Sequence, residues 1–341
     1  MNINFTLNRF FYFLSNDPKV EQIERILNCR IVNGKGRYYG KYISYLAFDS
    51  VNRDKITELE HALKKHVEVV KKDYNFIIKV YHYPLVKYCE YQFNQTKDLV
   101  LGIGYNGLVR IPMNTESNNY LICGCSGSGK STLAISIIKN LIDNHVDVVI
   151  VDNKSSFDYN GLDCPLFKGI NACLDQLYKF NHEIDTLLSE GKTHKKLLVI
   201  DEIFPFLLLS SKEKKEAYNL LALIMSKCRA VDYHIMILTQ RATTDIIDAK
   251  ILTHCSYRVC LTSSSKQESI NVLNCDIAYD ISIKGRGYLS VNGRLTEFQS
   301  YYYKQPKQDK KTTDDDITNI KNVEYNDCKE EIKEGITNKF L

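Results

Sequence analysis

The stretch at residues 119–132, NYLICGCSGSGKST, constrains the fold more than any other part of this sequence. It contains the complete pattern G-x-x-x-x-G-K-[ST], whose fixed positions hold Gly124, Gly129, Lys130 and Ser131. A short apolar run precedes the pattern, as in a buried strand, and apolar residues repeat at helical spacing after it. Strand, glycine-rich turn and helix in this order are the context of a phosphate-binding loop. The sequence therefore predicts an α/β protein that binds a nucleoside triphosphate.

The residue types of this loop explain how it would hold a nucleotide. Glycines let the backbone turn tightly, so that successive N–H groups point at phosphate oxygens, and the following helix presents its positive dipole end. We expect Lys130 to contact the β- and γ-phosphates and the Ser131 hydroxyl to ligate Mg²⁺. The predicted cofactors are thus ATP and Mg²⁺. The residues expected to surround the nucleotide are Gly124, Cys125, Ser126, Gly127, Ser128, Gly129, Lys130, Ser131 and Thr132.

Beyond the loop, strands and helices are predicted to alternate. Continuous apolar runs typical of buried parallel strands occupy residues 146–151, 196–202 and 233–238. Helices are predicted between them, at about 172–189 and 212–230. Further along we expect a helix near 245–252, a strand at 257–261, a helix from Lys266 and a hairpin that turns on Asn292 and Gly293. This alternation predicts a mainly parallel, doubly wound sheet with its ligands at the carboxyl ends of the strands.

Three residues at predicted strand ends are candidates for catalysis. Asp201 could hold Mg²⁺, and Glu202 could accept a proton from the attacking water. Many strands end in acids, but an acidic pair on the same sheet as a phosphate-binding loop favours hydrolysis over mere binding. Gln240 ends the strand expected beside that of Asp201, where an amide could touch the γ-phosphate; the alternative is a surface glutamine in a turn.

The chain before the loop is predicted to form a separate small α/β domain at residues 1–97. Its expected elements are a helix at 20–27, a strand at 42–48, a longer helix at 56–70 and a strand at 76–83. Residues 98–305 would form the ATPase domain, opening with a hairpin around Gly104 and Gly107. Residues 306–341 are rich in charged residues and are predicted to be a mobile, solvated tail with a short helix near 329–336.

Composition excludes several classes of protein. The net charge of +4 indicates no global nucleic-acid-binding surface, so such a surface would be a local patch. Eleven cysteines without a C-x-x-C pair, and eight histidines without zinc-finger spacing, favour reduced thiols in a cytoplasmic protein. No apolar run approaches the ~18–20 residues of a membrane span, and Arg9 interrupts an N-terminal run that lacks a cleavage site. We therefore expect neither a transmembrane segment nor a signal peptide.

Several motifs together resemble the FtsK/SpoIIIE family of hexameric double-stranded DNA translocases, within the HerA–FtsK group. The resemblance covers about residues 101–302. Its most specific part is residues 229–242, RAVDYHIMILTQRA, where the family reads Arg-Ala, a short turn, His, apolar residues and Thr-Gln-Arg-Pro. The other matching segments are Leu101–Gly102, the loop itself, VDNK at 151–154, VIDE at 199–202, SYR at 256–258 and GRG at 285–287.

The resemblance implies a RecA-like fold and a ring, expected to be a hexamer, that moves double-stranded DNA through a central pore. Arg229 matches the arginine that family members insert into the neighbouring subunit's site, where it would stabilise charge on the γ-phosphoryl group. The alternative for Arg229 is a cation that satisfies a helix C-terminus. Residues proposed to contact DNA are Lys154, Arg241, Lys266, Lys284 and Arg286, although a solvated charge is the better interpretation of each one taken alone.

The sequence also departs from the family pattern. Asn153 and Ala242 replace prolines, and neither a membrane-spanning N-terminus nor a winged-helix domain is expected. Such a chain resembles the short translocases of plasmids, integrative elements or phages. Partners implied are a relaxase or membrane transfer proteins, which could recruit the chain to the membrane. Two alternatives remain open, an ATPase that drives protein export and a nucleotide-dependent adaptor without motor activity.

Overall fold

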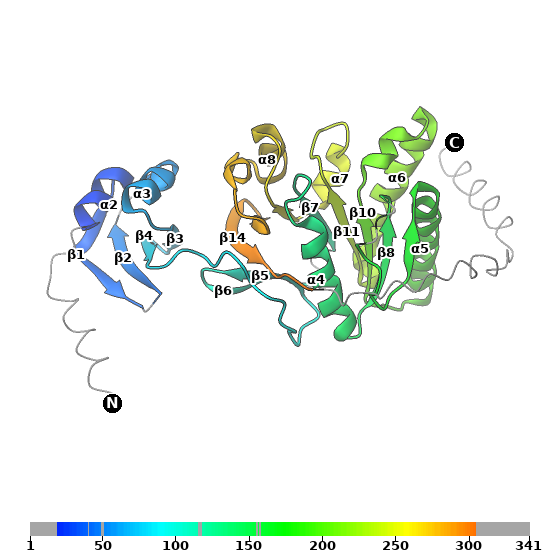
Figure 1. Cartoon of the computed structure of the whole chain (residues 1–341), viewed down its shortest axis with the longest axis horizontal. Coiled ribbons are helices and arrows are strands. Elements are labelled where there is room, and N and C mark those ends of the chain that lie inside the picture. The colour runs from blue at the N-terminus through cyan, green and yellow to red at the C-terminus, as the bar shows by residue number, and fades with distance from the viewer. Residues whose placement is uncertain are drawn as a thin grey trace, which may run out of the picture. The chain divides into compact units, whose positions relative to one another are not determined.

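The computed structural model describes residues 19–39, 41–48, 51–114, 118–154, 156 and 158–304 of the 341-residue chain. The predicted tail and its short helix lie outside these residues. Within them are two sheets, one of four strands and one of ten (Figure 1).

The ten-stranded sheet has the order β6-β5-β14-β13-β12-β7-β11-β10-β8-β9. The strands from β12 to β9 in this order run parallel, whereas β13, β14, β5 and β6 add an antiparallel extension. The predicted, mainly parallel sheet is therefore confirmed. The strands are β5 (Leu99–Gly104), β6 (Gly107–Ile111), β7 (Asn119–Cys123), β8 (Asp147–Asp152), β9 (Leu166–Lys168), β10 (Lys196–Asp201), β11 (Tyr233–Thr239), β12 (Tyr257–Cys260), β13 (Arg286–Val291) and β14 (Arg294–Ser300).

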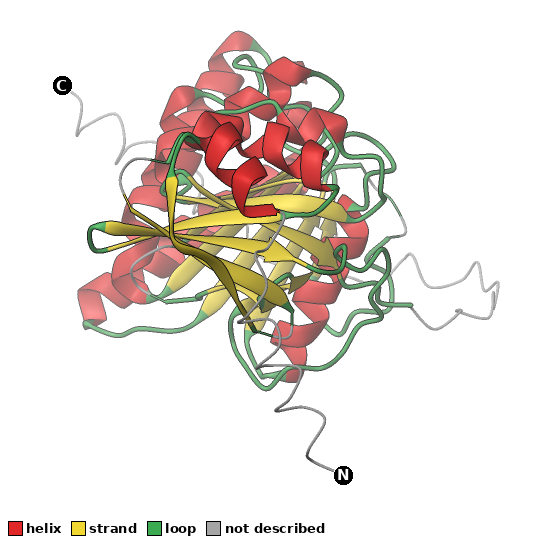
Figure 2. Cartoon of the chain, turned by 90° about the vertical axis from the view of Figure 1, so that its left-hand side faces the viewer, coloured by secondary structure: helices red, strands yellow, loops and turns green. Residues whose placement is uncertain are grey.

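Helices cover both faces of this sheet (Figure 2). Because side chains alternate along a strand, Leu197 and Val199 of β10 pack on the face with α4, and Leu198 and Ile200 pack on the face with α5 and α6. The apolar runs are continuous because both faces are buried. The helices are α4 (Lys130–Asp143), α5 (Ile170–Glu190), α6 (Ser211–Lys227), α7 (Ala249–His254) and α8 (Lys266–Leu273), with 3₁₀ turns η2 (Phe204–Leu208), η3 (Cys228–Val231) and η4 (Ile277–Asp280).

Local sequence signals fix several of these boundaries. Ser210 caps α6 in a reciprocal arrangement with Glu213, in which each side chain bonds the other's backbone N–H. The predicted hairpin between β13 and β14 turns on Asn292 and Gly293, whose φ values of 50° and 76° suit a tight two-residue turn. Within the described part of the chain, no helix combines the length and the apolar character that crossing a membrane requires.

The four-stranded sheet has the order β1-β2-β4-β3 and is antiparallel throughout. Its strands are β1 (Arg30–Tyr38), β2 (Tyr42–Phe48), β3 (Val67–Lys72) and β4 (Asn75–Tyr81), packed with α2 (Lys19–Leu27), α3 (Ile56–Leu63) and the turn η1 (Arg53–Lys55). It has an apolar core of its own, which includes Ile23, Ile43 and Ile78. The domain limits drawn from the sequence, 1–97 and 98–305, stay predictions.

The helix predicted at residues 56–70 is wrong in its second half. Helix α3 ends at Leu63 because Lys64 adopts a left-handed conformation with φ of 51°. The chain then enters β3, where Val67 and Val69 are β-branched residues that favour a strand. Strand β3 forms a hairpin with β4, and this non-local pairing overrides the helical spacing of the apolar residues.

Candidate active site

The phosphate-binding loop joins β7 to α4. All five residues of β7 are buried, and α4 begins at Lys130 with Gly129 as its N-cap. Gly127 and Gly129 have φ values of 79° and 105°, which strain any residue with a side chain. At Gly124 the requirement is space, because a Cβ there would lie 2.7 Å from Oγ of Ser128. These three glycines therefore shape the loop.

Two neighbouring segments brace this loop. The N–H group of Cys125 donates to the carbonyl of Thr262, just beyond β12, at 2.7 Å. The N–H group of Gly285 donates to the carbonyl of Ser128 at 2.9 Å. The Oγ atom of Ser128 is buried and has no hydrogen-bond partner among the described residues. An unpartnered polar atom inside a glycine-rich loop fits a loop built to receive a polar ligand.

Lys130 folds back onto the loop. Its Nζ atom donates to the carbonyls of Gly124 at 2.6 Å and Cys125 at 3.2 Å, and the residue is only 5% exposed. Burial lowers the pKa of Lys130, and the nearby charge of Lys154 lowers this pKa further. The next two residues, Ser131 and Thr132, are partly exposed in the first turn of α4.

The acidic pair lies at the same edge of the sheet. Asp201 ends β10 and is completely buried. Its Oδ2 atom accepts a 2.8 Å hydrogen bond from the hydroxyl of Tyr159, and its Oδ1 atom lies 3.1 Å from Nζ of Lys154. The same Nζ lies 3.7 Å from Oε2 of Glu202. Lys154 therefore bridges the two carboxylates.

Glu202 is held by the strand that precedes Gln240. The Oγ1 atom of Thr239 donates to Oε1 of Glu202 at 3.0 Å, and the N–H of Gln240 donates to Oε2 at 3.1 Å. Glu202 has a φ of 76°, a left-handed conformation that costs a residue with a side chain ~1–2 kcal/mol. Such a conformation persists because its surroundings hold it, which is common at functional sites.

Strand order explains why these groups converge. Strand β11 lies between β7 and β10, so Gln240, which follows it, lies between the phosphate-binding loop and the acidic pair. In register, Thr239 pairs with Cys123 and Leu238 pairs with Asp201. The structure thus brings Lys130, Asp201, Glu202 and Gln240 to one edge, as parallel strands require.

Two residues at this edge were not assigned to the site from the sequence. Tyr159 reaches Asp201 from an irregular loop, for which the sequence offered no signal. The predicted contact between Lys154 and DNA is not supported, because Lys154 engages the acids and its side chain is only 25% exposed. The signal that could have placed Lys154 in the site is strand order. Lys154 closely follows β8, and Asp152, the last residue of β8, pairs with Asp201 at the end of β10.

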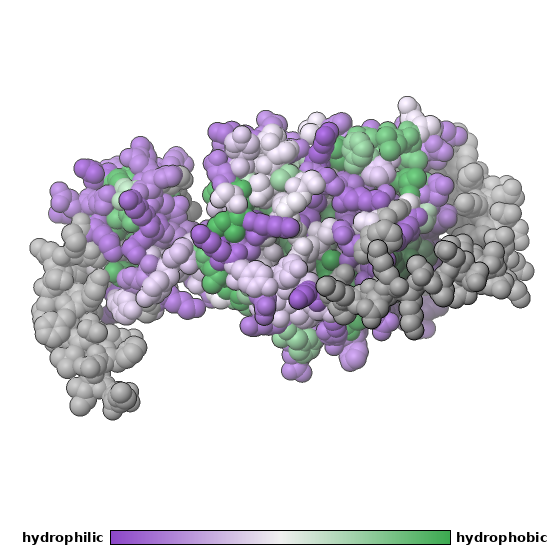
Figure 3. Space-filling model, viewed as in Figure 1, coloured by the Kyte–Doolittle hydropathy of each residue, from purple (hydrophilic) through white to green (hydrophobic). Residues whose placement is uncertain are grey.

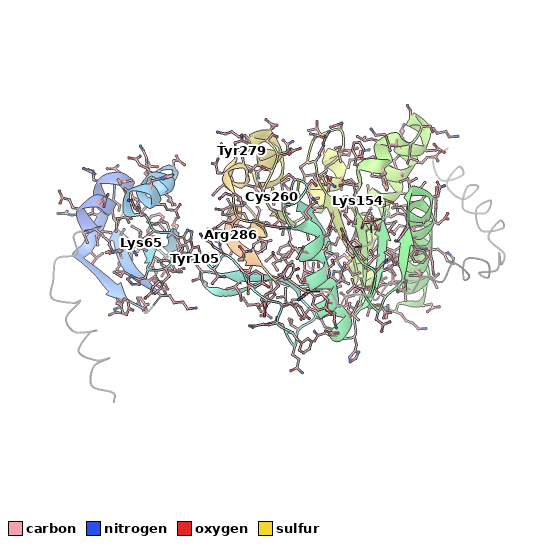
Figure 4. All side chains as sticks on the ribbon, viewed as in Figure 1. Lys65, Tyr105, Lys154, Cys260, Tyr279 and Arg286 are labelled. Atoms are coloured by element: carbon pink, nitrogen blue, oxygen red, sulfur yellow. The ribbon has the colours of Figure 1, made fainter. Side chains whose placement is uncertain are left out.

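The proposed contact between Arg286 and DNA is contradicted by its burial. Arg286 is 7% exposed and forms a 2.7 Å ion pair with Glu297. Its guanidinium also donates to Gln299 at 3.1 Å and to the carbonyls of Leu85 at 3.2 Å and Val86 at 2.6 Å. Arg286 thus links β13 and β14 to the segment after β4. A planar guanidinium with five N–H donors can bond all of these partners at once. Figure 4 labels Arg286 beside β14.

The structure does not bring Arg229 to the site of its own chain. Arg229 is exposed in η3, which precedes β11, whereas the other candidates follow the carboxyl ends of their strands. The seven residues of β11 span roughly 20 Å at about 3.3 Å per residue. Any role of Arg229 at a nucleotide therefore requires a second copy of the chain.

The oxygen donors at this edge fit Mg²⁺. Carboxylate and hydroxyl oxygens, as in Asp201 and Ser131, are its usual protein ligands beside nucleotide phosphates. The lysine ammonium between the two acids demonstrates that this place accommodates a positive charge. Among the described residues, no cluster of three or more His, Cys, Asp or Glu side chains offers a different kind of metal centre.

A family comparison agrees with this geometry. The model of the family described as helicase HerA, central domain, matches residues 109–333. The chain belongs to the HerA/FtsK family of P-loop ATPases. This HerA/FtsK-type ATPase is 25% identical over 199 residues to the DNA translocase FtsK of Borreliella burgdorferi. The match covers 50% of this chain and 25% of that protein, so the chain spans about a quarter of the length of this relative.

Solved structures share the fold of this HerA/FtsK-type ATPase. The pCW3 conjugation coupling protein TcpA, in its monomer form with ATPγS, has a TM-score of 0.59 at 18% identity, covering 87% of this chain and 95% of that one. The cytoplasmic domain of the Type VII secretion ATPase EccC of Thermomonospora curvata has a TM-score of 0.54 at 21% identity, covering 67% of this chain and 31% of that one. Both likenesses concern the RecA-like P-loop fold.

Proposed function

We propose that this ATPase hydrolyses ATP in a ring assembly to move DNA, for the transfer or processing of a plasmid, integrative element or phage. The observation that carries the proposal is the convergence of Asp201, Glu202 and Gln240 beside the phosphate-binding loop. A binding module without hydrolysis needs the loop alone, whereas hydrolysis also needs groups that orient and deprotonate water.

Each residue at this edge has a part in the proposed reaction. The loop amides and the N-terminus of α4 bind the phosphates, and Lys130 leaves the loop carbonyls to contact the β- and γ-phosphates. Asp201 and Ser131 would hold Mg²⁺, which would supply positive charge beside the phosphates. Glu202 accepts a proton from the attacking water, while Thr239 and the N–H of Gln240 fix its orientation. The Gln240 side chain contacts the γ-phosphate.

DNA as the cargo rests on the named relatives. FtsK is described as a DNA translocase and TcpA as a conjugation coupling protein, which supports DNA transfer as the process. Arg241, Lys266 and Lys284 remain candidates for contact with double-stranded DNA in a central pore. A relaxase or membrane transfer proteins would then recruit a cytoplasmic motor to its substrate.

Ring assembly, proposed to be hexameric, draws support from apolar surface near the acids. In η2, just after Glu202, Phe204 is 38% exposed and Leu208 is 76% exposed. Figure 3 displays an apolar area over the part of the molecule where α6 and α7 lie in Figure 1. Exposed apolar side chains beside a site are expected where another subunit covers them. In this ring, Arg229 of one copy would act on the nucleotide of its neighbour.

Protein export is a second candidate function, because the EccC fold likeness comes from a secretion ATPase. Hydrolysis by the purified wild-type protein, with and without long double-stranded DNA, separates the candidates. We expect DNA to stimulate hydrolysis, and we expect Glu202→Gln to abolish the stimulated rate. Hydrolysis that is indifferent to DNA points to a protein cargo, and the absence of any hydrolysis points to an adaptor.

A further inference from the structure

Lys154 occupies a place between the two acids of the site. Figure 4 labels this residue at the edge of the large sheet where α4 begins. Its ammonium lies 3.1 Å from Oδ1 of Asp201 and 3.7 Å from Oε2 of Glu202. Asp201 is completely buried and Glu202 is 5% exposed, so two carboxylates share this place with one cation. Without a cation, the like charges of the acids would repel each other.

The backbone of Lys154 is fixed, although its side chain is long. The carboxylate of Asp152 accepts a 2.9 Å hydrogen bond from the N–H of Lys154 and another at 2.9 Å from Oγ of Ser156. Asn153 donates from its side chain to the carbonyl of Glu202 at 2.9 Å. The ammonium itself ends a flexible four-carbon stem. The head group can therefore leave the acids without a rearrangement of the segment.

The two oxygens of Asp201 have partners of different mobility. Oδ2 accepts from Tyr159, a rigid side chain that is 1% exposed. Oδ1 faces the lysine, whose side chain is 25% exposed. An incoming cation can replace the ammonium far more easily than the buried phenol, so Oδ1 is the oxygen that becomes available.

We propose that Lys154 is a placeholder for the metal ion. In the absence of nucleotide its single positive charge offsets part of the negative charge of Asp201 and Glu202 and keeps the site assembled; Mg²⁺ binds only as the ammonium leaves. This inference rests on the proposed ATPase function of the same site. Lys154 lowers the affinity of the site for the metal, whereas Tyr159 raises it. The hydrogen bond of Tyr159 stays in place when the metal binds and orients the carboxylate of Asp201 toward it.

Binding of Mn²⁺ alone, without nucleotide, tests this assignment by electron paramagnetic resonance. Lys154→Met removes the competing cation, so we expect Mn²⁺ to bind at least about fivefold tighter than to the wild type. Tyr159→Phe removes the orienting hydrogen bond, so we expect about tenfold weaker binding. The matched control is Lys139→Met. Lys139 has a side-chain exposure similar to that of Lys154, but it pairs with Asp143 on α4, away from the acids. Its replacement should leave the affinity for Mn²⁺ unchanged.

Thermal unfolding gives a second readout. In a metal-free buffer, Lys154→Met should unfold at a lower temperature than the wild type, since its acids lose the cation that contacts them directly and keep only the more distant charge of Lys130. Saturating Mn²⁺ should raise the unfolding temperature of this variant by more than it raises that of the wild type. A Lys154→Met protein whose Mn²⁺ affinity and metal response equal those of the wild type overturns the placeholder role. Lys154→Gln serves the same comparison if the Met variant does not fold.

The outcome separates this inference from the proposed function. If wild-type protein hydrolyses ATP in response to DNA but Lys154→Met binds Mn²⁺ like the wild type, only the placeholder role fails. If wild-type protein hydrolyses no ATP while the two variants shift Mn²⁺ affinity in opposite directions, the proposed motor function fails and the cation site remains.

Discussion

The hydroxyl of Tyr159 donates a 2.8 Å hydrogen bond to Oδ2 of Asp201, across 42 residues of sequence. Both side chains are buried, and burial together with the charge of Asp201 raises the pKa of Tyr159 well above its ordinary value. The phenol therefore remains a proton donor at every physiological pH. It fixes the carboxylate that is proposed to hold the metal.

Tyr159→Phe should accordingly slow Mg²⁺-dependent ATP hydrolysis by about tenfold, the lower end of the effect of losing a partner of a metal ligand. The ring still fills its pocket, so the loss of stability should be limited to about 2 kcal/mol, typical of a hydrogen bond to a charged group. Steady-state hydrolysis at varied Mg²⁺ concentration and urea unfolding measure the two effects. Raised Mg²⁺ should recover part of the rate; a rate equal to that of the wild type contradicts the positioning role.

Glu202→Gln should abolish hydrolysis while nucleotide binding survives. The amide keeps the size of the side chain but cannot accept a proton from water, so we expect a loss of at least about 10²-fold. The phosphate-binding loop is unchanged, so the affinity for ATPγS should stay within a fewfold of the wild type. Glu216→Gln, on the exposed side of α6, is the matched control. If Glu202→Gln hydrolyses ATP at the wild-type rate, the general base lies elsewhere.

The stability of the fold should decline as the pH falls, through a buried histidine remote from the site. Nδ1 of His234 lies 2.9 Å from the hydroxyl of Tyr120, and Nε2 lies 2.9 Å from Oδ1 of Asp232. Burial lowers the pKa of His234 to about 4, although Asp232 opposes this effect. The unfolded chain takes up a proton below its ordinary value of 6.5, whereas the folded chain does so only near 4. Stability is therefore lost as the pH falls through this window, by about 3 kcal/mol.

Urea unfolding of wild type and His234→Gln between pH 7.5 and 4.5 checks this prediction. The variant should be less stable at pH 7.5, because it loses the packing and hydrogen bonds of the ring. The difference between the two proteins should shrink as the pH falls, since only the wild type pays for keeping this group neutral. A difference that is constant with pH means that the pKa of His234 is not lowered.

The parallel core could be predicted from sequence because each of its signals is local. Continuous apolar runs identify β8, β10 and β11, and the glycine pattern between a strand and a helix identifies the loop after β7. Convergence at one edge then follows from the rule for parallel strands. By contrast, β3 was hidden because Val67, Val69 and Val70 also fit helical spacing, and only pairing with β4 decides their conformation.

The site contained groups that no local pattern marks. Tyr159 lies in an irregular loop, and its contact with Asp201 depends on the path of that loop. Arg286 and Lys154 are basic residues near strand ends, which sequence alone cannot separate into buried ion pairs and free surface charges. The partners of Lys154, Asp201 and Glu202, come from a distant segment, whereas Glu297 lies in the strand paired with that of Arg286, so only the burial of that ion pair was hidden.

Arg286→Ala should destabilise the protein by about 3 kcal/mol, because it leaves Glu297 and two backbone carbonyls without their donor in a buried setting. Arg286→Lys keeps the charge but cannot reproduce the planar set of donors, so its loss should be smaller but measurable. The double variant Arg286→Ala with Glu297→Ala should recover part of the stability, since no buried charge is left unpaired. Urea unfolding measures all three; additive losses argue against a coupled pair.

Mixing of inactive variants tests whether Arg229 acts between subunits. Because Arg229 is exposed at the end of β11 opposite to Gln240, it can complete only a neighbour's site. Arg229→Ala should lose hydrolysis by about 10³-fold while binding ATPγS normally. Mixed with Lys130→Ala, it should recover part of the DNA-stimulated rate, because some interfaces then combine an intact loop with an intact arginine.

Lys130→Ala mixed with Glu202→Gln is the control, and it should recover no hydrolysis, because every site in this mixture lacks one of two residues that must come from the same chain. If the mixture of Arg229→Ala with Lys130→Ala recovers no more hydrolysis than this control, Arg229 does not act between subunits.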